Sequence, residues 1–144
     1  MTIRLLGLIP LADVRGPEVD QGELLRYFGE MFWFPTALLG EAVRWEPIDA
    51  NRARGTFEDE GLTVSALFEF GEDGSLRRVS AKRYREVEGE YRLEDWSGDA
   101  GDYRPVDGIL VPFQVRATWH LASGDLEYVR LELTDLEFDA GLVR

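Results

Sequence analysis

The segment Phe113-Gln-Val-Arg-Ala-Thr-Trp-His-Leu121 alternates apolar with polar side chains along its whole length. Strict alternation places successive side chains on opposite faces of a β-strand, so that one face meets a core and the other meets solvent. Strands with only one covered face are typical of antiparallel sheets. The segment therefore predicts an antiparallel sheet, whose apolar face would carry Phe113, Val115, Ala117, Trp119 and Leu121.

Strand-like segments also lie on both sides of this one. They are separated by turns rich in Gly, Asp and Ser, such as Gly71-Glu-Asp-Gly74, which favour hairpin connections between antiparallel strands. The segments with strand character are residues 3–9, 43–46, 52–57, 64–70, 76–84, 91–96, 109–111 and 126–138. Most of the chain after residue 40 is therefore expected to be β-structure.

In residues 126–138 the apolar positions change phase after Leu133. One extra residue in the strand would return the later apolar side chains to the same face as the earlier ones. A β-bulge inserts one such residue. We therefore predict a bulge near Thr134 or Asp135.

One convincing helix precedes the strands. Asp20 stands three residues before Glu23, which is the spacing of a capping box. Pro35 ends or kinks the helix, because proline cannot donate the backbone hydrogen bond. We predict one main helix over residues 20–34, with an apolar face formed by Leu24, Tyr27, Phe28, Met31 and Phe32.

The fold class follows from combining this helix with the strands. A one-sided sheet of many strands twists and curls when it covers a single helix. We expect an α+β fold, with a strongly curved antiparallel sheet of about eight strands, a half-barrel or open barrel, wrapped around the helix near residues 20–34. A chain of 144 residues suits one domain, so residues 1–144 are expected to form a single domain.

The overall composition excludes several classes of function. The net charge is −12, from 28 acidic and 16 basic residues, so the surface as a whole repels nucleic acids and anionic membranes. No apolar stretch is long enough to predict a membrane span. The apolar N-terminal stretch is broken by Pro10 and followed by charges, which favours a strand over a signal peptide and predicts a cytoplasmic protein.

The same composition limits metal and cofactor chemistry. The chain has no cysteine, which excludes disulfides, thiolate metal sites and cysteine nucleophiles. It has one histidine, His120, so a site with several histidine ligands is excluded as well. Neither a cofactor motif nor a metal-ligand spacing is present, and we expect no cofactor and no metal.

The densest apolar patch is Met31-Phe-Trp-Phe-Pro35. A helix buries only part of its circumference, so these side chains must spread over more than one face. They could plug one end of the curled sheet as part of the core. Alternatively they could line a pocket for an apolar ligand, with Trp45 and Trp119 as further walls.

Five basic residues lie close together, and a run of acidic residues follows them. Cross-strand ion pairing in a hairpin is one explanation. The other is an anion site, in which Arg83 and Arg85, flanking Tyr84, would hold a carboxylate or phosphate. The basic residues are Arg77, Arg78, Lys82, Arg83 and Arg85, and the acidic ones are Glu86, Glu88, Glu90, Glu94, Asp95, Asp99, Asp102 and Asp107.

His120 alternates with Trp119 and so falls on the polar face of its strand. Solvent exposure is the simpler interpretation. If that face instead lined a cavity, His120 would be the best general base in the chain, because its ordinary pKa lies near neutrality.

These features lead to one main functional hypothesis, a non-enzymatic binding domain whose concave face accepts a small apolar or amphipathic molecule. Its apolar wall would consist of Met31, Phe32, Trp33, Trp45 and Trp119, and its polar end of Arg83, Tyr84 and Arg85. One alternative is an acid–base enzyme in the same cavity, using His120 or Tyr84 with an arginine. The other alternative is a purely structural or dimerisation domain.

Several stretches along nearly the whole chain also resemble an uncharacterised bacterial and archaeal family of unknown function. The most specific is Trp33-Phe-Pro-Thr-Ala-Leu-Leu39, and others are Arg4-Leu-Leu-Gly-Leu-Ile-Pro10, Val43-Arg-Trp-Glu-Pro-Ile48 and Asp107-Gly-Ile-Leu-Val-Pro112. The resemblance implies no catalytic residues. More weakly, the late strand pair resembles the lipoprotein-carrier type of fold, a curled antiparallel sheet that holds acyl chains.

The resemblance also bears on oligomeric state. Members of that family tend to be longer, with strands before the equivalent of Ile3, so this chain would correspond to the C-terminal half or so, or would be a compact relative. A sheet without those strands has an exposed edge, and exposed edges tend to pair. We therefore predict that a second copy of the chain is a partner, in a homodimer that joins sheet edges or exchanges N-terminal segments.

Overall fold

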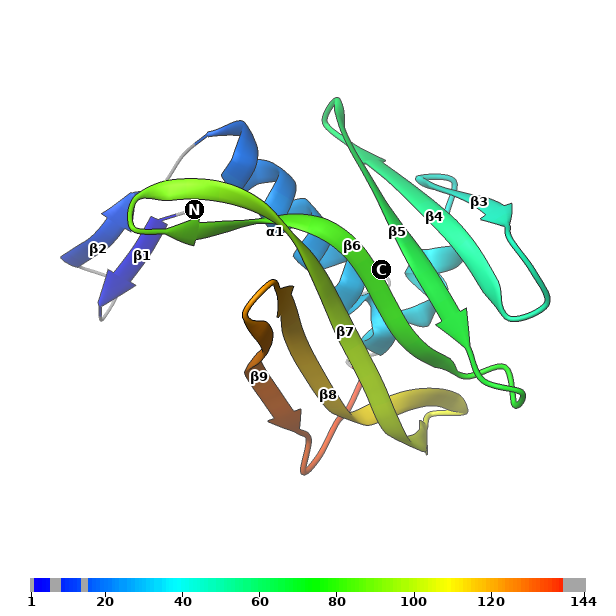
Figure 1. Ribbon diagram of the computed structural model, residues 1–144. Coiled ribbons are helices and arrows are strands. Elements are labelled where there is room, and N and C mark those ends of the chain that lie inside the picture. Colours follow the sequence, from blue (N-terminus) through cyan, green and yellow to red (C-terminus); the bar gives the residue numbers. More distant parts are fainter. Residues whose placement is uncertain (1, 6–8, 14–15, 139–144) are drawn as a thin grey trace.

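The computed structural model describes residues 2–5, 9–13 and 16–138 (Figure 1). The helical segment comprises α1 (Pro17–Glu30) and two short 3-10 helices, η1 (Met31–Trp33) and η2 (Pro35–Leu39). A small hairpin, β1 (Thr2–Leu5) with β2 (Ile9–Asp13), precedes it. The main sheet contains β3 (Val43–Pro47), β4 (Arg52–Asp59), β5 (Leu62–Phe70), β6 (Leu76–Val87), β7 (Glu90–Val106), β8 (Ile109–Leu121) and β9 (Gly124–Glu132).

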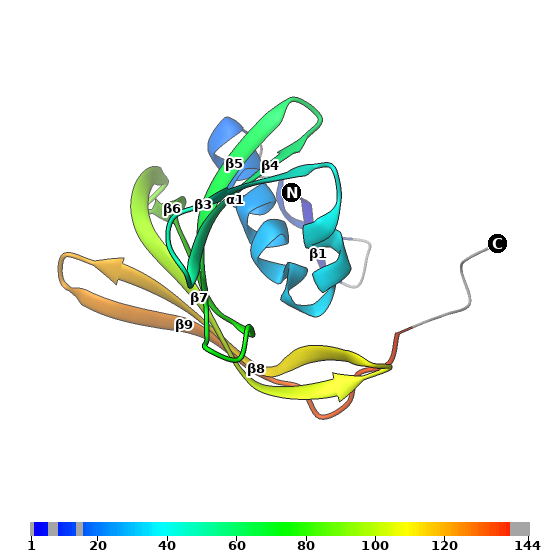
Figure 2. The same cartoon turned by 90° about the vertical axis from the view of Figure 1, so that its right-hand side faces the viewer.

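The main sheet is an antiparallel meander of seven strands, each paired with its neighbours in the chain. Its two edge strands, β3 and β9, do not pair with each other, so the sheet stays open. The predicted α+β class with an antiparallel sheet is confirmed. The sheet bends, and α1 lies on its concave side (Figure 2).

The prediction of about eight strands in a half-barrel was wrong, for two reasons. Residues 109–111 and 113–121 form one strand, β8, that runs through Pro112. Pro112 is tolerated there because β9 pairs with β8 only from Gln114 onward, so Pro112 lies beyond the end of β9. In addition, the predicted strand at residues 3–9 belongs partly to the separate β1–β2 hairpin, and residues 6–8 lie outside the described ranges.

The helix is confirmed, but it begins and ends earlier than residues 20–34. Pro17 lies in the first turn of α1, where a backbone N–H would have no hydrogen-bond acceptor within the helix, so a proline is tolerated. Asp20 is therefore inside the helix rather than at its N-cap, which is Gly16. Glu18 and Asp20 both lie in the first turn and interact favourably with the helix dipole.

The core lies between α1 and the half of the sheet that contains β4 to β6. Phe28 of α1 and Phe68 of β5 are fully buried, and their ring centroids are 5.0 Å apart. Gly55 of β4 allows this close packing, because a Cβ atom there would lie 2.8 Å from Phe28 and 2.9 Å from Phe68. Beyond the helix, a second, separate apolar cluster on β7 and β8 contains Trp96 and Trp119.

The bulge predicted near Thr134 or Asp135 is not there, because β9 already ends at Glu132. The register of β8 with β9 shifts instead between Ala117 and Thr118. Ala117 pairs with Val129, and the next residue, Thr118, pairs with Glu127. Tyr128 lies between these two partners in β9 and is therefore the inserted residue. Beyond Glu132, pairing with a neighbouring strand no longer determines toward which face of the sheet an apolar side chain points.

Candidate functional site

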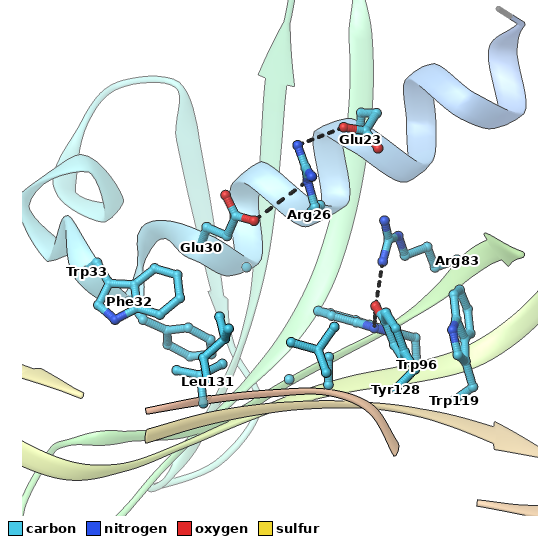
Figure 3. A pocket seen from close by; sticks show the side chains of 15 residues that line it. Glu23, Arg26, Glu30, Phe32, Trp33, Arg83, Trp96, Trp119, Tyr128 and Leu131 are labelled. Carbon is cyan, nitrogen blue, oxygen red and sulfur yellow. Dashed lines mark hydrogen bonds and ion pairs between the residues drawn. The ribbon is translucent and has the colours of Figure 1, made fainter. Parts of the chain in front are cut away.

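A cavity of about 380 Å³ lies between α1 and the inner face of β7, β8 and β9 (Figure 3). It occupies the part of the concave face that the packed core does not fill. Small residues help to leave this space open, namely Gly29 on α1, Gly98 on β7 and Ala117 on β8. The larger side chains that line it are Glu23, Arg26, Glu30, Phe32, Trp33, Arg83, Trp96, Val115, Trp119, Tyr128, Val129 and Leu131.

Three aromatic side chains from neighbouring strands form the wall on the sheet side. Trp96 and Trp119 are direct cross-strand partners and are both largely buried. Tyr128 stacks on Trp119 with ring centroids 5.7 Å apart and an interplanar angle of 26°. Tyr128 reaches this position because the bulge in β9 allows it to face the cavity together with Val129.

Arg83 of β6 provides a fixed positive charge beside this wall. Its Nε donates to the carbonyl oxygen of Gly22 at 3.0 Å, and its Nη1 lies 3.0 Å from the Tyr128 hydroxyl oxygen. The guanidinium carbon lies 5.5 Å from the ring centroid of Trp96 and 5.6 Å from that of Trp119, which are cation–π distances. Arg83 thus connects α1 to the aromatic wall.

The Tyr128 hydroxyl accepts two hydrogen bonds, one from Arg83 and one from Trp96 Nε1 at 2.9 Å. A phenol has one proton of its own to donate. Among the described residues, neither the Tyr128 O–H nor Arg83 Nη2 donates to a protein acceptor. Both groups remain able to donate to a ligand in the cavity.

The helix side of the cavity carries an exposed ion network. Arg26 Nη2 lies 2.8 Å from Glu23 Oε2, and Arg26 Nε lies 3.6 Å from Glu30 Oε1. Together with Arg83, the lining carries two positive and two negative groups. Because the Arg26 pairs are largely solvated, they contribute little to stability and can rearrange around a ligand.

The structure brings together half of the side chains that the sequence proposed for binding. Phe32, Trp33, Arg83 and Trp119 line the cavity. Trp33 is held in place by its indole N–H, which donates to the Pro112 carbonyl at 3.1 Å. These four residues therefore remain candidates for binding.

The other four proposed residues lie outside the cavity. Met31 is buried in the main core. Trp45 packs edge-on against Phe68 and donates its indole N–H to a backbone carbonyl of η2. Tyr84 follows Arg83 on β6 and so points to the opposite face, whereas Arg85 shares the face of Arg83 but does not line the cavity.

Trp96 and Tyr128 also line the cavity but were not predicted as site residues, for two different reasons. Trp96 is at the end of a predicted strand, but its place beside Trp119 depends on the register of β7 with β8. Tyr128 is hidden by the bulge, because strict alternation from Val129 would place it on the outer face. No local pattern in the sequence marks that position.

Two of the five residues of the basic run form cross-strand ion pairs, as one of the two explanations predicted. Arg78 lies 2.6 Å from Asp99, and Lys82 lies 2.9 Å from Asp95, each pair joining β6 to its direct partner on β7. Arg83 is different, because it points to the inner face. The predicted anion site is therefore absent, because its three residues, Arg83, Tyr84 and Arg85, do not come together.

His120 lies on the outer face of the sheet, opposite to the cavity, because its neighbour Trp119 points inward. It therefore cannot act as a base within the cavity. In the described ranges, no group of three or more His, Cys, Asp or Glu side chains is arranged to hold a metal ion. None of the helices in those ranges is both long and apolar enough to cross a membrane.

The fold and the cavity define an α+β domain in which an open antiparallel meander carries one helix on its concave face and an aromatic cavity beside that helix. The chain belongs to the family of unknown function DUF6544, whose family model matches residues 1–131. This agrees with the resemblance to an uncharacterised family. Comparisons with curated proteins and with solved structures gave no match, so the likeness to lipoprotein carriers stays a prediction.

Proposed function

We propose that this protein is a non-enzymatic binding domain that holds one small amphipathic molecule in the cavity between α1 and β7 to β9. The observation that carries the proposal is the position of Arg83, whose charge is held against an aromatic wall inside a cavity of about 380 Å³. That volume is within the range of small-molecule sites, about 300–1,000 Å³.

The walls of the cavity suit the apolar part of such a molecule. Phe32, Trp33, Trp96, Trp119 and Leu131 present large apolar surfaces. Trp119 and Trp96 are already packed by neighbouring side chains, so a ligand would not have to order them first. Preformed walls reduce the entropy lost on binding.

The polar end of the molecule would lie at Arg83 and Tyr128. Both groups can donate hydrogen bonds into the same part of the cavity, and neither offers a charge that would repel an anion. A carboxylate accepts such donors well, and charge-assisted hydrogen bonds are the stronger kind. We therefore propose a ligand with a hydrocarbon or aromatic body and an acidic or strongly accepting head.

The test is a binding titration across a panel of medium-chain fatty acids, aromatic acids and lysophospholipids, measured by calorimetry and thermal shift. The variant Leu131→Trp places extra bulk in the cavity and should abolish the binding seen with the wild type. Leu126→Trp is the matched control, because Leu126 and Leu131 are on the same strand and are 42% and 43% exposed, but only Leu131 lines the cavity.

Two results would speak against this proposal. One is the absence of saturable binding across the panel in an assay that detects a known fatty-acid binder. The other is equal binding by Leu131→Trp and the wild type. The acid–base alternative does not apply to this cavity, because neither His120 nor Tyr84 lines it.

A further inference from the structure

Three side chains on the outer face of β7, β8 and β9 are joined by two short hydrogen bonds. Ser97 Oγ lies 2.9 Å from His120 Nε2, and His120 Nδ1 lies 2.8 Å from Asp125 Oδ1. This face is opposite to the cavity, and the three strands are adjacent in the sheet (Figure 1). The arrangement is a nucleophile, a base and an acidic group that orients the base.

The sheet register holds these side chains in place. His120 and Asp125 are direct cross-strand partners on β8 and β9. Ser97 pairs with Thr118, two residues from His120 on the same face, so Ser97 and His120 are diagonal neighbours. Groups on paired strands are positioned more rigidly than groups on loops.

The hydrogen bonds also fix which nitrogen of His120 carries the proton in the neutral ring. An ionised Asp125 can only accept, so Nδ1 must be the donor. The lone pair of Nε2 is then directed at Ser97, whose hydroxyl donates to it. Ser97 Oγ also lies 3.4 Å from Asp99 Oδ2, but its one proton favours the shorter contact with His120.

Charged side chains of both signs surround Ser97. Ser97 is 1% exposed and is the one polar residue buried among the described residues. It lines a depression of the outer face together with His120, with the cations Arg78 and Lys82, and with the carboxylates Glu69 and Asp95. Within the described ranges Arg78 uses only its Nε, for Asp99, so its terminal nitrogens can donate to a developing oxyanion.

We propose that Ser97 is a nucleophile toward small carboxylic esters, with His120 as its general base and Asp125 as a positioning residue. The activity is separate from ligand binding in the cavity, because the two sites lie on opposite faces of the sheet. An ester fits better than a peptide, because an alcohol leaves more easily than an amine.

The reaction balances without any cofactor. Ser97 Oγ attacks the carbonyl carbon while its proton passes to His120 Nε2, and the carbonyl electrons move to the oxyanion beside Arg78. When the carbonyl reforms, the bond to the leaving alkoxide breaks and His120 gives it the proton. Water then attacks the acyl-serine, its proton passes through His120 to Ser97 Oγ, and the carboxylic acid is released.

The experiment is covalent labelling with diisopropyl fluorophosphate, followed by intact mass and peptide mapping. We expect one adduct, on Ser97. Ser97→Ala should give no adduct, and His120→Gln should label at least about 100-fold more slowly. Ser80→Ala is the matched control, because Ser80 lines the same depression and should leave labelling unchanged.

Asp125→Asn tests the positioning role. It keeps the size of the side chain but removes the carboxylate that accepts from His120 Nδ1, so labelling of Ser97 should slow. Asp125→Glu should restore part of the rate. A merely structural role for Asp125 would change thermal stability but leave the labelling rate of the folded protein unchanged in both variants.

Three outcomes would overturn the proposal. The first is that wild-type Ser97 gives no adduct although chymotrypsin is labelled under the same conditions. The second is an adduct that maps to another residue. The third is equal labelling of His120→Gln and the wild type. His120 is partly exposed, so His120→Gln should fold even if Ser97→Ala does not. Binding in the cavity is scored separately, and its failure would not affect these results.

Discussion

The hydroxyl of Tyr128 lies 3.0 Å from Nη1 of Arg83, although the two residues are on strands separated by two others. Neighbouring strands lie about 4.8 Å apart, so these side chains must reach over β7 and β8 to meet. They do so across Trp96 and Trp119, which lie beneath the contact (Figure 3). The contact therefore depends on the bend of the sheet and on the bulge in β9.

This relationship predicts that Tyr128→Phe destabilises the protein. The substitution keeps the stacking on Trp119 but removes the acceptor for both Arg83 and Trp96. We expect a loss of about 1–2 kcal/mol in the free energy of unfolding, measured by urea denaturation. Tyr27→Phe is the control, because Tyr27 is 55% exposed and its hydroxyl has no hydrogen-bond partner in the described ranges. Equal stability of Tyr128→Phe and wild type would contradict the assigned contacts.

A second prediction concerns the charge in the cavity. Arg83→Met should weaken binding of an acidic amphiphile by about 10- to 100-fold, because a charge-assisted hydrogen bond is lost. Binding of the matching uncharged alcohol should change much less. Arg85→Met is the control, since Arg85 is on the same strand and face but outside the cavity. Equal losses for the acid and the alcohol in calorimetry would show that Arg83 acts only through packing.

A third prediction concerns the packing of the core. Gly55→Ala would place a Cβ atom 2.8 Å from the Phe28 ring and 2.9 Å from the Phe68 ring. Overpacking of this kind should cost about 1–3 kcal/mol of stability, measured by thermal or urea unfolding. Gly101→Ala has no heavy atom within 4 Å of the new Cβ and should be neutral or slightly stabilising. If both variants unfold alike, the close approach at Gly55 is not real.

A fourth prediction concerns titration at high pH. Burial raises the pKa of Tyr103 to about 12, and its hydroxyl donates to the carbonyl oxygen of Leu76. Since the folded-state pKa lies above the ordinary value of 10.0, the contribution of Tyr103 to stability is complete below pH 10 and is lost as the pH rises toward 12. An ultraviolet titration should show a late tyrosine component near pH 12 that is lost in Tyr103→Phe.

A fifth prediction is that the chain forms a homodimer through a sheet edge. β3 and β9 are the edge strands of the main sheet, and each pairs with only one neighbour. Sedimentation velocity should show a dimer at high protein concentration, and Val129→Pro should disfavour it if β9 is the edge involved. A stable monomer over the whole concentration range would count against the prediction.

The correct parts of the sequence interpretation rest on periodicity. The face of α1 follows from spacings of three and four residues between Leu24 and Phe28, and the inward direction of Trp119 follows from alternation in β8. These patterns are local, because each side chain's direction depends only on the backbone of its own element. The ion pairs of Arg78 and Lys82 were also predictable once a hairpin was assumed.

The errors concern relations between elements. The sequence predicts Trp45 and Trp119 in one wall, but Trp45 packs against Phe68 and donates a hydrogen bond to η2. Tyr128 was not recognised, because a bulge reverses the facing of later residues without any change in composition. Bulge position depends on how two strands align, and that alignment is decided by the sum of all their contacts.

Residue periodicity alone yields the elements, namely one amphipathic helix and a succession of one-sided strands joined by tight turns. The partners of individual side chains follow from the folded arrangement instead: Arg83 meets Tyr128 on the inner face, and Ser97 meets His120, which meets Asp125, on the outer face. Helical and strand periods are set within a few residues, whereas strand register and sheet bending are set by packing between distant parts of the chain.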